Sequence, residues 1–208
     1  MNELRYTLIG DGSSDKRLIP VLNWLLQRHS FRRIAATWAD FSVLRESPRT
    51  LSAKVAAAIE LYPSDLLFVH RDAETAPRTQ RISEIVDACL PYPNQPIVAV
   101  IPIRMQEAWL LISEEAIRTA AGRPRGRVPL NLPALSSLEA QPDPKQTLYD
   151  ALEMASEHRG RHLRRFKASA AAYRVSEIIE DYAPLCGLSA FRDLENDVLS
   201  VLRERNLM

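Results

Sequence analysis

The chain has 208 residues, which is long enough for one domain with a buried core, or for one domain with a modest helical extension. An apolar fraction of 46% and a charged fraction of 25% are typical of a soluble globular protein. No apolar run approaches the length of a membrane span, and no signal peptide precedes the first strand-like segment. These features exclude a membrane-spanning protein and favour a cytoplasmic one without a membrane partner.

The basic residues are clustered, although the formal net charge of +1 is uninformative. Residues 159–167 read RGRHLRRFK, which brings five Lys and Arg side chains together without an acid. A second basic cluster, Arg123, Arg125 and Arg127, lies in a segment that contains Gly and Pro. Such clusters are candidate phosphate-binding surfaces, and a solvated face without a ligand is the alternative interpretation.

The two cysteines, Cys89 and Cys186, are far apart in the sequence and do not have the spacing of metal ligands. Both have apolar neighbours. We therefore expect two reduced thiols in the core.

The first element is a short β-type run over residues 4–10, which ends in Gly and leads into the turn sequence DGSSD. The last residues of that turn are typical helix caps, and apolar residues recur at helical spacing from Leu18 to Leu26, with Pro20 in the first turn. The strand, loop and helix contain neither G-x-G-x-x-G nor G-x-x-x-x-G-K-[ST]. Instead an acid, Asp11, stands directly at the end of the strand.

Strand-like and helix-like segments alternate through the following part of the chain. Residues 33–38 are a weak strand candidate, residues 49–61 and 78–90 have helical periodicity, and residues 66–69 and 97–101 are continuous apolar runs of strand length. This alternation predicts βαβ units. We therefore expect an α/β fold with a mainly parallel, Rossmann-like sheet and flanking helices.

The segment LLFVHRDAE over residues 66–74 is the centre of this pattern. Its apolar run is followed by Asp72 and Glu74, and the carboxyl end of a parallel strand is where α/β sheets bind ligands. Two carboxylates so close repel each other unless a cation or a proton lies between them. Because Mg²⁺ and Mn²⁺ take oxygen ligands, we expect one of them to bind Asp72 and Glu74, with Asp11 nearby as a further ligand. A solvated loop after a strand is the alternative.

A further acid follows the strand at 97–101. Residues 102–111 read PIRMQEAWLL, which places Glu107 near the start of a helix and again at the carboxyl edge of the sheet. Trp109, Leu110 and Leu111 are expected in the core.

The character of the sequence changes after Gly122. Residues 123–144 are rich in Pro and Arg and predict an irregular loop, and no strand signal follows it. Helices are expected over residues 145–157, 169–182 and 188–205. The predicted organisation is therefore an α/β core over residues 1–122, a loop over 123–144, and a helical extension packed on the core over 145–208.

The order of an acid after the first strand, D-x-E after a central strand and Glu before a Trp-containing helix resembles a Toprim domain. This is the metal-binding fold of topoisomerases, primases and overcoming-lysogenization-defect nucleases. More narrowly, the chain resembles the DUF4276 family of small bacterial Toprim-like proteins, some of which are linked to phage defence. The matching stretches span most of the chain and are GDGSSDKRLIPVL at 10–22, FVHRDAE at 68–74, MQEAWLL at 105–111 and DPKQTL at 143–148.

The resemblance implies a role for several positions. Toprim domains use a Glu after the first strand to handle protons and a D-x-D for the metal, which correspond here to Asp11 and to Asp72 with Glu74. Both positions depart from the family pattern, since the shorter Asp11 reaches less far than Glu, whereas Glu74 is still an oxygen ligand. Glu107 in the E-x-W segment would add a metal ligand. Lys145 in the P-K pair would contact a phosphate at the catalytic site.

Three functions fit these residues. The first is metal-dependent phosphodiester chemistry on nucleic acid, as in a nuclease, with carboxylates that hold Mg²⁺ or Mn²⁺ and activate water. The second is a non-catalytic partner or regulator, for example the companion of an ATPase in a defence system, which fits the missing P-loop. The third is a phosphohydrolase or phosphotransferase for small molecules, which the missing D-x-D-x-[TV] motif disfavours. We expect the first.

In the nuclease hypothesis, basic side chains hold backbone phosphates without reading sequence. His70 could assist proton transfer, although a His at the end of a buried strand is more commonly structural. The competing hypothesis for the basic segment is that its arginines pair with Glu177, Glu180 and Asp181 of the following helix. The residues expected to contact phosphates are Lys16, Arg71, Arg159, Arg161, Arg164, Arg165 and Lys167, together with Lys145.

Overall fold

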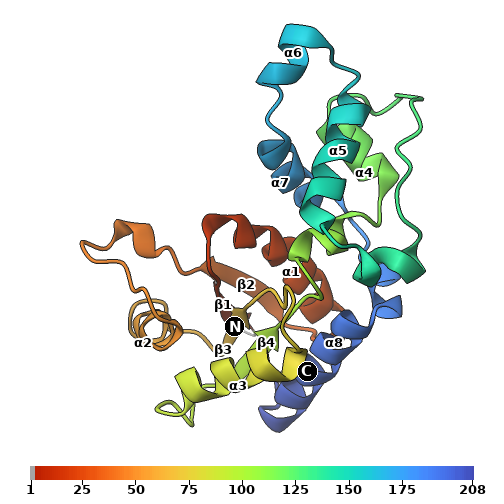
Figure 1. Ribbon diagram of the computed structural model, residues 1–208. Helices are drawn as coiled ribbons and strands as arrows, with labels where there is room; N and C mark the ends of the chain where they lie inside the picture. Colours follow the sequence, from red (N-terminus) through yellow and green to blue (C-terminus); the bar gives the residue numbers. More distant parts are fainter. Residues whose placement is uncertain (1–2) are drawn as a thin grey trace. The chain divides into compact units, whose positions relative to one another are not determined.

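A parallel β-sheet forms the centre of the first half of the chain (Figure 1). The protein is seen in a computed structural model that describes residues 3–208. The strands in this range are β1 (Glu3–Ile9), β2 (Arg33–Trp38), β3 (Leu66–His70) and β4 (Ile97–Val100). All neighbours pair in parallel, in the order β2-β1-β3-β4. The expected α/β fold with a parallel sheet, flanking helices and a helical C-terminal region is confirmed.

Helices connect the strands and form the regular structure beyond β4, where no further strand occurs within residues 3–208. The α-helices are α1 (Leu18–His29), α2 (Leu51–Leu61), α3 (Arg78–Cys89), α4 (Glu114–Ala120), α5 (Pro144–Ser156), α6 (Gly160–Arg165), α7 (Ala168–Ile178) and α8 (Ser189–Glu204). Short 3₁₀ helices are η1 (Ser13–Arg17), η2 (Phe41–Val43), η3 (Gln106–Leu110), η4 (Leu135–Ala140) and η5 (Ala183–Gly187). The loop expected over 123–144 is irregular except for η4, and α6 lies within the basic segment 159–167.

The strength of each strand signal follows from its place in the sheet. β3 is central, and all five of its residues are buried, so its sequence is a continuous apolar run apart from the terminal His70. β2 is an edge strand whose residues are exposed or half-buried, which explains why its sequence pattern is weak.

The chain divides into two compact units. The first contains the residues up to Ile101 together with Arg192–Met208, and the second is Pro102–Phe191. The amino-acid composition changes after Gly122, but the boundaries between the two packed units lie directly after β4 and within α8. The strands and the loops that follow β1 and β3 all belong to the first unit.

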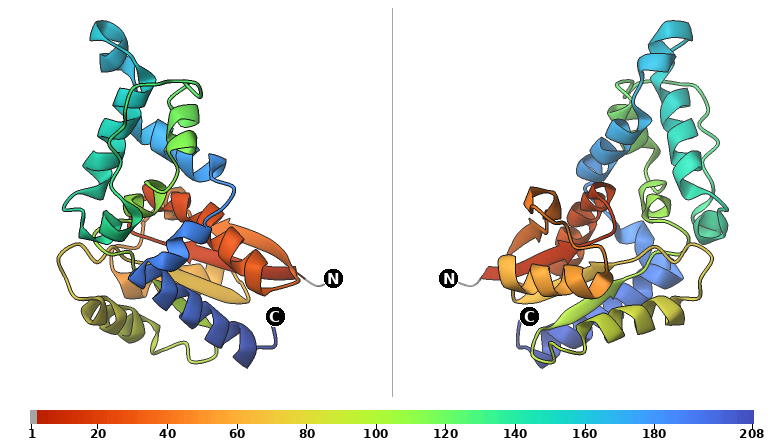
Figure 2. Two further views of the ribbon diagram at one scale, coloured as in Figure 1. Left: turned by 90° about the vertical axis from the view of Figure 1, so that its right-hand side faces the viewer. Right: turned by 60° about the vertical axis from the view of Figure 1, so that its left-hand side comes forward.

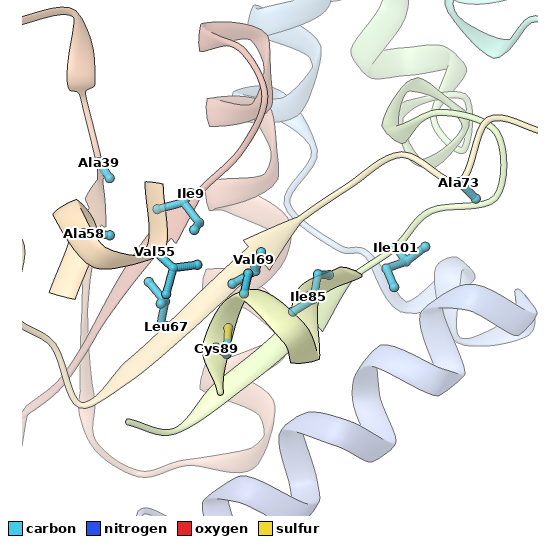
Figure 3. Close-up of a cluster of buried hydrophobic side chains, with 11 residues drawn as sticks. Ile9, Ala39, Val55, Ala58, Leu67, Val69, Ala73, Ile85, Cys89 and Ile101 are labelled. Carbon is cyan, nitrogen blue, oxygen red and sulfur yellow. The ribbon is translucent and has the colours of Figure 1, made fainter. Parts of the chain in front are cut away.

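The sheet of the first unit is covered by helices on both faces (Figures 1 and 2). On one face Tyr6 of β1 packs edge-on against Phe68 of β3, and its hydroxyl donates to Asn23 Oδ1 of α1 at 2.9 Å. On the other face lie α2 and α3, whose apolar residues pack against the alternate strand residues (Figure 3). This second cluster includes Ile9, Leu67 and Val69 from the strands, Val55 and Ala58 from α2, and Ile85, Ala88 and Cys89 from α3. Alternation along each strand thus separates two cores.

The part of α8 that belongs to the first unit is held by ion pairs. Glu195 Oε1 lies 2.7 Å from His29 Nε2 of α1, and Arg78 Nη2 of α3 lies 3.1 Å from Asp197 Oδ2. The C-terminal helix therefore bridges α1 and α3, although more than a hundred residues separate it from either in the sequence.

The second unit is built from helices around Trp109, which is 1% exposed and packs edge-on against Phe191. The expected core positions Leu110 and Leu111 are buried as well. Arg174 of α7 fixes the end of α4, because its Nη2 donates to the Ala120 carbonyl at 2.7 Å. Within residues 3–208 no helix combines the length and apolar character that crossing a membrane requires.

Neither cysteine forms a disulfide within residues 3–208. Cys89 is buried in α3 as expected, and burial raises the pKa of its thiol to about 11. Cys186 is half-buried in η5.

Candidate functional site

The carboxyl ends of β1 and β3 form the switch point of the sheet. The chain leaves β1 towards β2 on one side and leaves β3 towards β4 on the other, while β1 and β3 are neighbours. Ile9, the last residue of β1, lies opposite Val69 of β3, so the two following loops begin side by side. Ligands of open α/β sheets bind in the crevice at such a point.

The loop after β1 wraps around the carboxylate of Asp15. Its Oδ2 accepts hydrogen bonds from the backbone N–H of Asp11 at 2.8 Å and of Gly12 at 3.2 Å, and its Oδ1 accepts from the Ser14 hydroxyl at 3.0 Å. Asp15 is only 5% exposed. A Cβ at Gly10 would overlap this carboxylate, which explains the glycine at the end of β1.

His70 ends β3 and is 2% exposed. Its Nδ1 lies 3.0 Å from the Val100 carbonyl oxygen. Because a carbonyl only accepts hydrogen bonds, Nδ1 carries a proton and Nε2 is the nitrogen left for chemistry. Nε2 lies 3.5 Å from Asp72 Oδ1 and 3.9 Å from Asp15 Oδ2. Two carboxylates from two loops thus approach one buried imidazole nitrogen.

The side chain of Asp11 contacts different residues from the side chain of Asp15. Its carboxylate lies 3.1 Å from Lys54 Nζ of α2 and 3.2 Å from Arg71 Nε, and Lys54 also donates to the Gly10 carbonyl at 2.9 Å. The Asp11 side chain is 59% exposed, whereas both cations are largely buried. This carboxylate is therefore held by two cationic side chains, one from α2 and one from the loop after β3.

Arg81 of α3 shapes the loop that carries D-x-E. Its Nε donates to the Asp72 carbonyl at 3.1 Å, its Nη1 to the Glu84 carboxylate at 3.0 Å, and its Nη2 to Glu74 Oε2 at 3.5 Å. Glu74 is 63% exposed and has a left-handed backbone, with φ of 53°. Burial would raise the pKa of Glu84, but hydrogen bonds and charges of Arg81 and Arg71 lower it below its usual value. Asp72 and Glu74 consequently have different partners.

The structure brings four of the predicted site residues to this edge, namely Asp11, Arg71, Asp72 and Glu74. Lys16 also belongs to the first unit, where its Nζ lies 4.0 Å from Asp40 Oδ2 and 5.9 Å from the centre of the Trp38 ring. The other predicted residues belong to the second unit. Glu107 lies in η3 and is 3% exposed, whereas Lys145 is exposed in the first turn of α5, next to the capping residue Asp143.

Sequence patterns alone missed the role of Asp15 as the buried acid of the site. It was expected only as a helix cap, and its side chain does bind backbone N–H groups at the start of η1. The sequence feature that could have indicated this role is the glycine on each side of Asp11, because these glycines allow the loop to fold around the Asp15 side chain.

The side chains as they lie form no ready-made metal cage. Within residues 3–208, no group of three or more His, Cys, Asp or Glu side chains is arranged to hold one metal ion. The donor chemistry still suits Mg²⁺, because this ion is usually bound by one or two carboxylates and completes its shell with water and substrate phosphate.

The basic segment belongs to the second unit and is exposed. None of its five Lys and Arg side chains forms an ion pair within residues 3–208, so the expected alternative of pairing with Glu177, Glu180 and Asp181 is not seen there. The Arg123, Arg125 and Arg127 side chains line a separate hollow of about 500 Å³ together with Glu157.

Comparison with protein-family models, with curated proteins and with solved structures found no match to this chain.

Proposed function

We propose that the edge of the sheet between β1 and β3 is the active site of a Toprim-like, metal-dependent phosphodiesterase that acts on nucleic acid. The observation that carries this proposal is the approach of Asp15 and Asp72 to one buried nitrogen of His70 at the switch point of the sheet. Carboxylates and an imidazole brought together at the edge of a sheet are groups that metal-assisted hydrolysis uses.

Asp72 is the first proposed ligand of Mg²⁺ or Mn²⁺. Its side chain is 28% exposed, so it can reach both a hydrated cation and a substrate. Asp15 would be the second, and Glu74 would join after exchanging its ion pair with Arg81. When bound, the cation would stabilise the negative charge that develops on the phosphoryl oxygens. Glu107, in the second unit, stays a predicted ligand.

His70 is the group we assign to proton transfer. Its Nδ1 is held by the Val100 carbonyl, which fixes the ring and directs Nε2 towards the edge. Nε2 would take a proton from the attacking water, and the nearby Asp15 would stabilise the resulting imidazolium. The leaving oxygen would receive a proton from solvent or from the same nitrogen.

The resemblance to Toprim domains gives the proton-handling role to Asp11. Because Asp11 is paired with Lys54 and Arg71, we assign it a different role, which is to hold these two cations where they can meet phosphate oxygens. Lys145 and the basic segment of the second unit would add contacts to the nucleic-acid backbone.

The non-catalytic alternative also has an observation in its favour. Asp11 and Glu74 are already balanced by cationic side chains of the protein, so the edge needs no metal ion to neutralise them. In that case the unit would be a binding partner, for example of an ATPase that supplies the motor activity in a defence system.

Cleavage of nucleic acid distinguishes these two functions. Purified protein with Mg²⁺ or Mn²⁺ is expected to cut plasmid or single-stranded substrates, and EDTA is expected to stop the reaction. Asp72→Asn and His70→Gln should each lower the rate by at least about a hundredfold, the lower range for a positioned acid or base.

Asp65→Asn is the matched control. Asp65 precedes β3 at the opposite end of the same strand, so the variant makes the same change of charge away from the edge. Equal rates for Asp72→Asn and Asp65→Asn, or no metal-dependent cleavage by the wild type, would reject catalysis in favour of the binding partner.

A further inference from the structure

A hollow of about 380 Å³ lies in the second unit between α6 and α7. Its lining residues are far in sequence from the acids of the sheet edge. Pockets of this order hold small ligands or single groups of larger ones. The residues that line it are His158, His162, Arg165, Phe166, Lys167, Ala170 and Arg174. All belong to the second unit, and no Asp or Glu is among them.

Aromatic rings form one part of this hollow. The ring of His158 meets Phe166 at a centroid distance of 6.0 Å and an angle of 70°, and it meets His162 at 6.1 Å and 40°. Phe166 is half-buried, so part of its ring is open to a ligand. The His158 ring, just before α6, therefore contacts one ring within this helix and one directly after it.

Cationic side chains form the rest. Arg165 and Lys167 are exposed and form no ion pair within residues 3–208. Arg174 is held in place, because its Nε and Nη2 both donate to the Ala120 carbonyl, at 3.2 and 2.7 Å. A positive charge held by hydrogen bonds thus lies beside two exposed ones.

This combination has a specific chemical meaning. Aromatic rings alone would accept many apolar groups, and cations alone would accept any phosphate. Together, without an acid, they suit a chain of phosphates whose bases are free to stack. A duplex does not offer such bases, because its bases are already stacked and paired on each other.

We propose that this hollow binds a nucleotide of single-stranded nucleic acid. The base stacks on Phe166, with the His158 ring beside it at a steep angle, and Arg165 and Lys167 contact the flanking phosphates. The inference rests on the proposed function in taking nucleic acid as the substrate, and it names the single strand as the form that is held. It differs from a general basic surface because it depends on an aromatic residue.

A neighbouring hollow, which shares His158 in its lining, supports the choice of this one. It is larger, about 800 Å³, but Asp150, Glu153 and Glu157 contribute to its lining. Three carboxylates would repel a phosphate chain, so the strand is expected to avoid it.

The test is binding of a fluorescein-labelled oligothymidine in EDTA, where cleavage cannot occur. Wild type is expected to bind the single strand more tightly than a duplex of equal length. Phe166→Ala should weaken binding by roughly 5- to 150-fold, the range for loss of one stacked base. Phe166→Tyr keeps a ring and should bind like wild type. Tyr173→Ala, an exposed aromatic of α7 outside the hollow, is the matched control and should change nothing.

Each outcome has one meaning. Equal binding by Phe166→Ala and wild type, equal affinity for single and double strands, or no binding by wild type would overturn the inference. Stacking-dependent binding without metal-dependent cleavage would uphold the inference and reject the proposed catalysis. If Phe166→Ala cleaved and bound the oligonucleotide like wild type, the proposed catalysis would stand and the inference about the hollow would be rejected.

Discussion

The edge of the sheet and the basic segment 159–167 differ in whether their charged side chains have partners within the protein. At the edge, Asp11 and Glu74 each have a cationic partner within 3.5 Å, and Asp15 is enclosed by hydrogen-bond donors. In the segment 159–167, five cationic side chains are exposed and have no acidic partner within residues 3–208. Asp11, Glu74 and Asp15 thus have partners within the protein, whereas the second region is left to interact with something outside the protein.

Because of this difference, we expect the charges of the sheet edge to contribute to stability and those of the basic segment to contribute to ligand binding. Charges that are balanced and partly buried contribute to stability, because removing one partner leaves the other unpaired. Exposed cations contribute little to stability, but they bind polyanions by releasing condensed counterions. Substitutions in the two regions should therefore have different readouts.

The largest expected effect is on stability, at Asp15. Asp15→Ala removes a buried carboxylate and leaves the partly buried backbone N–H groups of Asp11 and Gly12 without their acceptor. At about 1–3 kcal/mol for each unsatisfied group, the free energy of unfolding should fall by roughly 2 kcal/mol, the low end, because water can reach these partly buried groups. Urea denaturation followed by circular dichroism measures this loss.

Asp11→Ala is the comparison within the same loop. Its side chain is 59% exposed, so loss of its ion pairs should change the free energy of unfolding by less than about 1 kcal/mol. If the two variants were equally stable, the loop would not be organised around Asp15.

A smaller effect is expected on nucleic-acid affinity, at α6. Arg164→Ala combined with Arg165→Ala should lower the magnitude of the log–log salt slope of binding by about 0.7 to 0.9 for each lost phosphate contact. The free energy of unfolding should change by no more than about 0.5 kcal/mol, because neither side chain has an acidic partner within the described residues. Titrations from low to physiological salt provide the slope.

The opposite pattern would restore the competing hypothesis for the segment. If the double variant unfolded more easily while its salt slope stayed that of wild type, these arginines would serve the fold by pairing with acids such as Glu177.

The smallest expected effect is on the pH dependence of stability, at Asp65. Burial raises the pKa of this carboxyl, but the Arg5 backbone N–H at 2.9 Å and the Arg5 guanidinium lower it more, so the net pKa is below the usual value. A carboxyl with a lowered pKa in the folded state stabilises the fold above its unfolded pKa of about 3.9, and this contribution is lost as the pH falls through the lower, folded value. Asp65→Asn should thus be less stable than wild type at pH 7.

Denaturation at a series of pH values checks this prediction. The gap between wild type and Asp65→Asn should narrow as the pH falls below about 4. A gap that stayed constant down to pH 2 would mean that Asp65 acts through its shape and hydrogen bonds rather than its charge.

The elements of the fold were predictable wherever local sequence and tertiary environment agree. The run at 66–69 is continuous because β3 is central and buried on both faces, and Thr50 and Asp143 begin α2 and α5 by accepting hydrogen bonds from Ala53 and Gln146. The division into units was harder, because α8 joins the first unit through side chains such as Glu195 that pair across long sequence separations.

The sequence predicts where the site lies in the sheet, but it does not predict which side chains contact each other there. Parallel strands bring Asp11 and Asp72 to one edge whatever the details of the loops. Which carboxylate meets the imidazole depends on loop closure, and here Asp15 rather than Asp11 approaches His70. Composition could not reveal this, because both acids lie in the same five-residue turn, DGSSD.

The central claim, that the edge between β1 and β3 binds a divalent cation, is tested most directly by calorimetric titration with Mn²⁺. Wild type and Asp65→Asn should bind Mn²⁺ with the same affinity, whereas Asp72→Asn should bind at least about tenfold more weakly, as expected when a group at a metal site is lost. Equal Mn²⁺ affinity for Asp72→Asn and wild type would contradict the claim.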